Sequence, residues 1–181
     1  MYAYVSSSYI KNVLAGSGSS GEAGGSDGDK NTSDDFGDCG TITIPAELAG
    51  AIEYSAHVRE LGWMDTKQNG QMMGTTGKNL PMEAMKINIA GIADLGIEYQ
   101  VHAQDFGWMD SVANGETGGT VGQAKKLEAI KLKLTGNAAS NYDLYYRVHV
   151  TNIGWMDWAK NGELAGTQGY NYALQIGRAH V

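Results

Sequence analysis

The sequence repeats one block of residues three times, and this repetition constrains the fold more than any other feature. Each copy has a histidine, a Gly-Trp-Met-Asp that begins five residues later, then Asn-Gly, and then Gly-Thr with a further glycine. The copies occupy residues 54–81, 99–126 and 146–172, offset by 45 and then 47 residues. Tandem equivalent units are typical of a multivalent binder or a symmetric scaffold, because a catalytic centre needs unlike groups that converge once.

The composition narrows the classes of function that this chain can have. The formal net charge is −7, but residues 15–40 contain six acidic residues and one lysine, so the repeats are close to neutral. No basic surface is predicted, which argues against a nucleic-acid partner. The only cysteine, Cys39, has no partner for an internal disulfide. No apolar run is long enough to span a bilayer, and the first residues lack the pattern of a signal peptide, so we expect any export signal to lie outside this chain.

The chain divides into four parts. Residues 1–14 remain unassigned, and residues 15–40 are rich in Gly, Ser and Asp, which predicts a disordered linker. The domain is predicted to cover residues 41–175 as three repeats, at 41–85, 86–130 and 131–175. In this division the strand at 41–44 is an extra copy of the last strand, and we expect it to close the ring beside the third repeat, which would remove an exposed sheet edge.

Strands are predicted at both ends of each repeat. In the first repeat Ile52, Tyr54, Ala56 and Val58 alternate with polar residues that include His57. A period of two indicates a strand with one buried face, and it places the histidines on the polar face. The final strand, seen as Ile130, Leu132 and Leu134 in the second repeat, alternates in the same way. Between the two strands, Asn-Gly predicts a tight turn with positive φ.

The end of the third repeat departs from the pattern. Six residues separate Gly77 from Ala84, whereas three separate Gly169 from Ala173, which suggests a deletion of three residues. Residues 176–181 match no repeat and resemble a translated sequencing-adapter sequence. We therefore predict that residues 176–181 are an artefact and that the natural protein continues differently.

The repeated aromatic and polar residues are the candidate binding groups. A tryptophan can stack on a sugar ring while an aspartate and the Asn-Gly turn hold its hydroxyl groups. Alternatively, the tryptophans fill the core around the pseudo-threefold axis, since Trp is highly buried on average. The candidate ligand-binding residues are Trp63, Asp65, Asn69, Trp108, Asp110, Asn114, Trp155, Asp157 and Asn161.

Histidines and one additional tryptophan are secondary candidates. His57, His102 and His149 would form a metal site or a pH-sensitive cluster only if they converged. Their positions on a polar strand face favour local hydrogen bonds to a turn instead, so we predict no metal and no cofactor. Trp158 occurs in one repeat and is expected to be the more exposed aromatic residue. Glu83 and Glu128 begin the final strands. Neither has a second carboxylate at a fixed spacing, as a glycosidase would need, so we interpret them as turn or edge residues and predict no enzyme activity.

The repeated block resembles the ChW repeat, the "clostridial hydrophobic with conserved Trp" module of bacterial surface and secreted proteins. The strongest matches are 102–110, 119–122 and 127–132 in the second repeat and 145–169 in the third. The resemblance implies export from Gram-positive anaerobes and a role at the cell surface in polysaccharide or protein binding. Met64, Met109 and Met156 stand where the family often has Gln.

Together these observations predict an all-β, three-fold pseudosymmetric domain, either a β-prism or a β-trefoil. The predicted function is non-catalytic, multivalent binding of polysaccharide at the cell surface by an exported bacterial protein. The alternative is a structural or protein-interaction scaffold on that surface. Exposed tryptophans beside the aspartates and turns would favour the first function, and buried tryptophans with an apolar patch elsewhere would favour the second.

Overall fold

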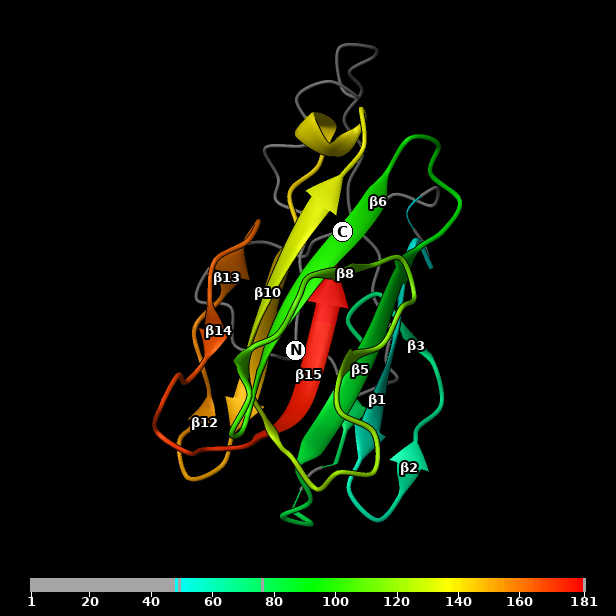
Figure 1. The fold of residues 1–181 in the computed structure, drawn as a ribbon. Coiled ribbons are helices and arrows are strands. Elements are labelled where there is room, and N and C mark those ends of the chain that lie inside the picture. The colour runs from blue at the N-terminus through cyan, green and yellow to red at the C-terminus, as the bar shows by residue number, and fades with distance from the viewer. Residues whose placement is uncertain (1–47, 49, 76, 181) are drawn as a thin grey trace, which may run out of the picture.

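The computed structural model describes residues 48, 50–75 and 77–180, and in them the chain forms three separate antiparallel sheets. Each sheet is built on a pair of long strands that come from one repeat (Figure 1). The pairs are β1 (Ile52–Val58) with β5 (Met82–Ile89), β6 (Gly96–Ala103) with β10 (Leu127–Thr135), and β11 (Tyr145–Val150) with β15 (Leu174–His180). A 3₁₀ turn at Ala139–Asn141 precedes β11.

Three short strands separate the long strands of each repeat. The first two pair with the first long strand of their own repeat. These strands are β2 (Gly62–Trp63), β3 (Lys67–Gln68), β7 (Gly107–Trp108), β8 (Val112–Ala113), β12 (Gly154–Trp155) and β13 (Ala159–Lys160). Asn-Gly turns follow β3, β8 and β13, and both residues of each turn have positive φ, as predicted.

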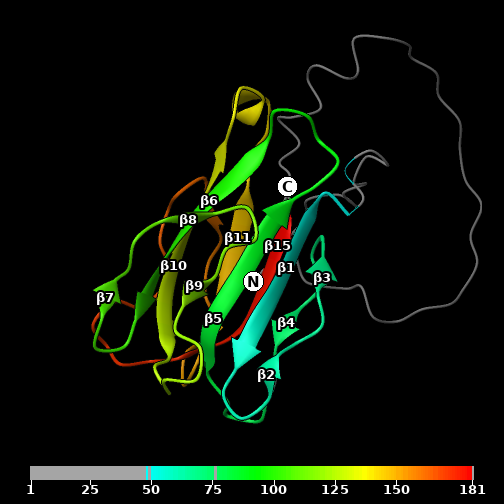
Figure 2. The same ribbon diagram turned by 45° about the vertical axis from the view of Figure 1, so that its right-hand side comes forward.

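The third short strand of each repeat leaves its own sheet and pairs with the sheet of another repeat. These strands are β4 (Met73–Gly74), β9 (Gly118–Gly119) and β14 (Ala165–Gly166). Strand β9 pairs with β5 of the first repeat (Figure 2), β14 pairs with β10 of the second, and β4 pairs with β15 of the third. The exchange is cyclic, so the ring of sheets is closed by the pairing of β4 with β15.

The predicted closure by residues 41–44 lies outside the described residues, as do the unassigned segment 1–14 and the predicted linker 15–40. The predicted repeat boundaries stay a prediction. In the structure each sheet takes its two long strands from within 52–89, 96–135 or 145–180.

One hydrophobic core lies inside the three sheets. The inward face of each first long strand is buried, as the alternating pattern predicts, and Ile52, Tyr54, Ala56 and Val58 are each at most 1% exposed. Side chains from all three repeats contribute to one buried cluster. Three separate sheets around a common core form a β-prism arrangement, whereas a β-trefoil is built on one closed barrel. The all-β, three-fold prediction is confirmed.

Glycine is required where each exchanged strand crosses the neighbouring sheet. Gly119 has φ of +108°, and a Cβ at this position would overlap the carbonyl oxygen of Glu83 and lie 2.8 Å from Cα of Ala84. Gly74 and Gly166 have the same conformation and the same crowding against Gln175 and Glu128. The repeated Gly-Thr pair therefore forms the connection between neighbouring repeats, because only glycine lets the two backbones approach this closely.

The third repeat has no deletion in its strand register. Leu174 pairs with Val150 and Ile176 with His149, just as Met82 pairs with Val58 and Ala84 with His57. The expectation that three residues are missing was wrong, because it matched Ala173 to Ala84, whereas strand pairing matches Ile176 to it. Gln175 consequently occupies the position of Glu83 and Glu128. That residues 176–181 are an artefact stays a prediction.

Candidate functional site

A tryptophan and a histidine lie side by side on the outer face of each sheet. The short strands place Trp63 opposite His57, Trp108 opposite His102 and Trp155 opposite His149. Directly opposed residues of an antiparallel pair project from the same face. The rings meet edge to face, with centroid separations of 5.5, 5.4 and 5.6 Å in the three repeats. Each of the three sheets therefore carries one such aromatic pair on its outer face, with nearly the same geometry.

A cation lies over each of these tryptophan rings. The nitrogen Nζ of Lys86 is 4.6 Å from the ring centroid of Trp63, and Nζ of Lys131 is 4.5 Å from that of Trp108. Both lysines are on the last long strand of their repeat, on the same face as the histidine. In the third repeat the guanidinium of Arg147, from β11, takes this role at 4.9 Å from Trp155. Each site thus combines an indole, an imidazole and a cation.

The tryptophans are surface residues. Trp63 is 38% exposed, and Trp108 and Trp155 are half-buried. The hypothesis that tryptophan fills the core is therefore wrong. Tyrosines occupy that place, because they lie on the inward-facing positions of the first long strands. The three core tyrosines are Tyr54, Tyr99 and Tyr146.

The core tyrosines also join neighbouring repeats. The hydroxyl of Tyr99 donates to the carbonyl of Glu116 in its own repeat and accepts from the backbone N–H of Ile87 in the first repeat at 3.2 Å. The hydroxyl of Tyr146 does the same, with Leu132 N–H of the second repeat as its donor at 3.0 Å. Burial raises the pKa of Tyr146 to about 12. These hydroxyl groups stay protonated and structural.

The predicted polar partners of the tryptophans divide into two groups. Asp65, Asp110 and Asp157 are exposed, each two residues after its tryptophan. The turn asparagines lie at the other end of the first long strand, where Asn69 accepts from Ile52 N–H at 3.2 Å. Asn114 and Asn161 repeat this contact with Ile97 and Leu144 at 2.9 and 2.8 Å. The structure therefore does not bring the asparagines to the tryptophans, and their amide oxygens are engaged by the backbone.

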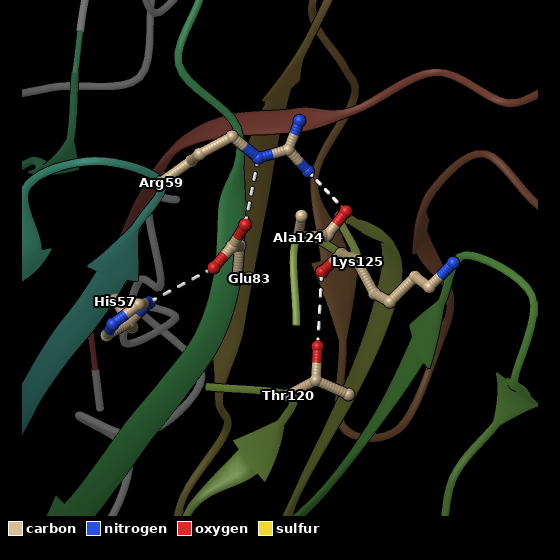
Figure 3. A network of polar contacts seen from close by, with 6 residues as sticks. All are labelled: His57, Arg59, Glu83, Thr120, Ala124 and Lys125. Carbon is tan, nitrogen blue, oxygen red and sulfur yellow. Dashed lines mark hydrogen bonds and ion pairs between the residues drawn. The ribbon is translucent and has the colours of Figure 1, made fainter. Parts of the chain in front are cut away.

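A buried carboxylate lies behind the histidine in two repeats. Glu83 is 2% exposed, and its carboxylate contacts Nδ1 of His57 at 3.5 Å and Nε of Arg59 at 2.9 Å (Figure 3). Glu128 is 4% exposed and lies 3.2 Å from Nδ1 of His102. Both glutamates sit where the strand register shifts, and the bulge places each carboxylate beside the histidine of the neighbouring strand. Their interpretation as turn or edge residues was wrong.

The histidines therefore have a different partner from the predicted one. They contact a tryptophan and, in the first two repeats, a strand carboxylate, instead of a turn. Each lies on its own sheet. Among residues 48, 50–75 and 77–180, no three His, Cys, Asp or Glu side chains lie together in a way that could hold a metal ion.

In the same part of the chain, no helix has the length and apolar character needed to cross a membrane.

Comparison with known proteins identifies the repeat. The sequence pattern described as "Clostridial hydrophobic W" (ChW) matches residues 57–91, 102–136 and 149–175, which together are more than half of the chain. The chain belongs to the ChW family. No curated protein and no solved structure matches it. ChW repeats are typical of bacterial extracellular proteins, and this chain is a repeat module of a bacterial protein.

The matched ChW segments begin at the three histidines. Each therefore contains the histidine, its tryptophan and the Gly-Thr strand that crosses to another sheet. The third segment ends at Gln175, so it includes the position of the buried glutamate but stops before the rest of β15.

The three ChW sites differ in their charged groups. Arg59 supports the carboxylate in the first repeat, where it also donates to the carbonyl of Ala124 in the second repeat at 2.6 Å (Figure 3). In the third repeat Gln175 replaces the glutamate, and burial lowers the pKa of His149 while the Gln175 side chain partly offsets that effect. The first site is therefore the one in which an arginine and a histidine share the buried carboxylate.

Trp158 belongs to the third ChW site. It is half-buried, and the guanidinium of Arg147 lies 5.0 Å from its ring centroid as well as 4.9 Å from that of Trp155. The expectation that Trp158 is the more exposed tryptophan was wrong, because Trp63 is the one exposed beyond one third. A second tryptophan beside the same arginine enlarges the aromatic surface of this repeat.

Sequence reasoning missed the cations and the buried glutamates of the ChW sites. The sequence contained a signal for the lysines, because Lys86 and Lys131 alternate with the buried residues of their strands. This alternation places them on the polar face of the sheet, which also carries the histidines. The signal for the glutamates was their recurrence before Ala84 and Ala129. The bulge that buries them is a register feature, which one strand alone does not reveal.

Proposed function

We propose that the ChW repeats of this chain form a non-catalytic, multivalent module that binds polysaccharide at the bacterial cell surface. The observation that supports this function is the tryptophan on the outer face of each sheet, with a histidine edge and a cation beside it. A partly exposed indole can stack on a sugar ring, and the adjacent polar groups can bind hydroxyl or acidic substituents.

The polar groups favour a particular class of polysaccharide. The cations that lie over the rings are Lys86, Lys131 and Arg147. A polymer that carries carboxylate or phosphate groups can pair these groups with the cation while a neighbouring sugar contacts the indole. We therefore expect acidic cell-wall polysaccharides to bind more tightly than neutral ones. Exposed Asp65, Asp110 and Asp157 provide acceptors for sugar hydroxyl groups near the same rings.

The three equivalent sites suit a repetitive polymer. Each site is small and is expected to bind weakly. One polymer chain that contacts two or three sheets gains affinity because the second contact is intramolecular. The loss of one tryptophan should then weaken binding to the polymer by about tenfold or more, while hardly changing the affinity for a short oligosaccharide at the remaining sites.

The test is a titration of the chain with purified cell-wall polysaccharides, followed by intrinsic tryptophan fluorescence and by calorimetry. Trp63→Ala and Trp108→Ala are the decisive variants, and Lys86→Gln tests the cation while it leaves the indole in place. Tyr170→Ala removes an aromatic ring that is 71% exposed and outside the three sites, so it is the matched control. Binding that survives loss of the two tryptophans in a folded chain would contradict the proposal.

One observation favours a structural or protein-interaction scaffold, in which the tryptophans serve packing alone, as the second candidate. Each tryptophan already contacts a cation and a histidine of its own repeat, which is also how a structural surface aromatic is packed. If so, Trp63→Ala would lower the free energy of unfolding without any change in polysaccharide binding. The two functions are separated by measuring stability and binding on the same variants.

A further inference from the structure

Large apolar side chains project from the same position in all three repeats. Leu61, Phe106 and Ile153 are 48%, 53% and 50% exposed. Each stands at the tip of the hairpin that joins the first long strand to the tryptophan strand. Its N–H donates to the carbonyl at the end of the long strand, at 3.1, 3.1 and 3.2 Å. The three tips are held in tight turns and present their side chains to solvent.

The three tips lie at one end of the prism. The arrows of β5, β10 and β15 point upward in Figure 1, and each first long strand is antiparallel to one of them, so the hairpins that follow the first long strands lie at the lower end. Hydrogen bonds between repeats connect the loops there: Arg59 to the carbonyl of Ala124 and Lys126 to the carbonyl of Asn171, both at 2.6 Å. Val121 and Tyr170, in the same loops, are also exposed. We call this end, with its tips Leu61, Phe106 and Ile153, the apolar end.

The two ends of the prism differ in charge. The hairpin tips and loops of the apolar end carry four cations and two acids, namely Arg59, Lys78, Lys125, Lys126, Glu60 and Asp105. The loops at the opposite end, residues 69–72, 90–95, 114–117, 136–144 and 161–164, carry four acids and no lysine or arginine. These acids are Asp94, Glu116, Asp143 and Glu163. Some of these charges are paired: Arg59 with the buried carboxylate of Glu83 at 2.9 Å, Lys125 with Asp105 at 2.6 Å, and Asp143 with Lys160 at 2.9 Å.

We propose that the apolar end docks onto a lipid bilayer that contains anionic headgroups. Three apolar side chains on separate projecting hairpins can enter the interfacial region together, while the cations around them lie at headgroup level. The acidic end points away from the negative surface. Projecting points suit a flat, fluid surface, whereas a protein partner would need three matching pockets at fixed positions. This site goes beyond polysaccharide binding, which uses the faces of the sheets.

The experiment is co-sedimentation of the full chain with vesicles of phosphatidylcholine alone or with a quarter phosphatidylglycerol. The test variant replaces all three tips, as Leu61→Ser, Phe106→Ser and Ile153→Ser. The control replaces the exposed apolar residues of the opposite end, as Met72→Ser and Leu164→Ser, which are 44% and 41% exposed in the wild type. Because all five side chains lie on the surface, both variants are expected to fold, and circular dichroism checks this.

We expect the wild type and the control to bind the anionic vesicles, with binding that weakens as salt increases, and the tip variant to lose about tenfold or more in affinity. Trp63→Ala should retain vesicle binding, which separates this proposal from polysaccharide binding. A wild type that does not sediment with anionic vesicles would overturn the proposal. So would equal losses in both variants, or dimers in analytical ultracentrifugation that only the tip variant abolishes, which would identify a second copy of the chain as the occupant.

Discussion

At the scale of single residues, glycine decides how neighbouring repeats join. Gly119 has φ of +108°, and its backbone lies against the backbone of Glu83 and Ala84. Gly122 has φ of +70°, but there is open space where its Cβ would lie. Both are in the same Gly-Thr-Val-Gly segment. Only the first is required by the packing of one repeat on another.

These two glycines make a matched pair for a stability test. We expect Gly119→Ala to lower the free energy of unfolding by about 2–4 kcal/mol, because the added methyl group overlaps the β5 backbone and the φ is strained. Gly122→Ala should cost about 1 kcal/mol, since only the φ is unfavourable. Urea unfolding monitored by circular dichroism measures both. Equal losses would show that the close approach of β9 to β5 contributes nothing.

The half-buried histidine of the third repeat gives the domain a pH dependence. Because burial lowers the pKa of His149, the unfolded chain binds a proton more readily than the folded one. The contribution of this group to stability is therefore fully present above about pH 6.5, the ordinary histidine value, and is lost as the pH falls below it. The variant His149→Gln should lose less stability than the wild type between pH 7 and pH 5 in parallel urea titrations. Identical slopes would contradict this assignment.

At the scale of elements, strand β15 has smaller buried side chains than its equivalents β5 and β10. Strand β15 places Gly177 where β5 and β10 have Met85 and Ile130, and Ala179 where they have Ile87 and Leu132. Ala179 is fully buried. The strand that completes the third sheet therefore brings less apolar volume to the core than its two equivalents.

Restoring that volume should stabilise the domain. We expect Ala179→Leu to raise the free energy of unfolding by about 1 kcal/mol, because cavity-filling substitutions commonly give gains of this size. The reverse change at the equivalent position, Leu132→Ala, should cost about 2–5 kcal/mol. Thermal and urea unfolding of the two variants test this. A less stable Ala179→Leu variant would mean that neighbouring side chains have already filled the space.

At the scale of the whole molecule, the repeats are interdependent. Each sheet receives one short strand from another repeat, and each of Tyr99 and Tyr146 connects its repeat to the one before it. A linear array of stacked repeats can lose a terminal unit and keep the others folded. A closed ring has no terminal unit, so loss of any repeat exposes an edge on one remaining sheet and leaves a short strand of the other remaining repeat without its partner.

We therefore expect the three repeats to unfold in one cooperative transition. Tryptophan fluorescence and far-ultraviolet circular dichroism should give superimposable urea curves, and Leu132→Ala in the second repeat should shift the whole curve. The control is Tyr170→Ala, an exposed change that should leave the midpoint unchanged. Two separated transitions, or a Leu132→Ala effect confined to part of the signal, would show that the repeats fold independently.

The amino-acid sequence alone predicts the repeat, the long strands, their buried faces, the Asn-Gly turns and the family, because each of these depends on residues close together in the chain. Tertiary structure decided which strand covers which sheet edge. It put Trp63 outside, since pairing with His57 fixes the face of the tryptophan. It also buried Glu83 and set Lys86 over the indole. These features arise from pairing between distant segments, and a period of two specifies a face but not a partner.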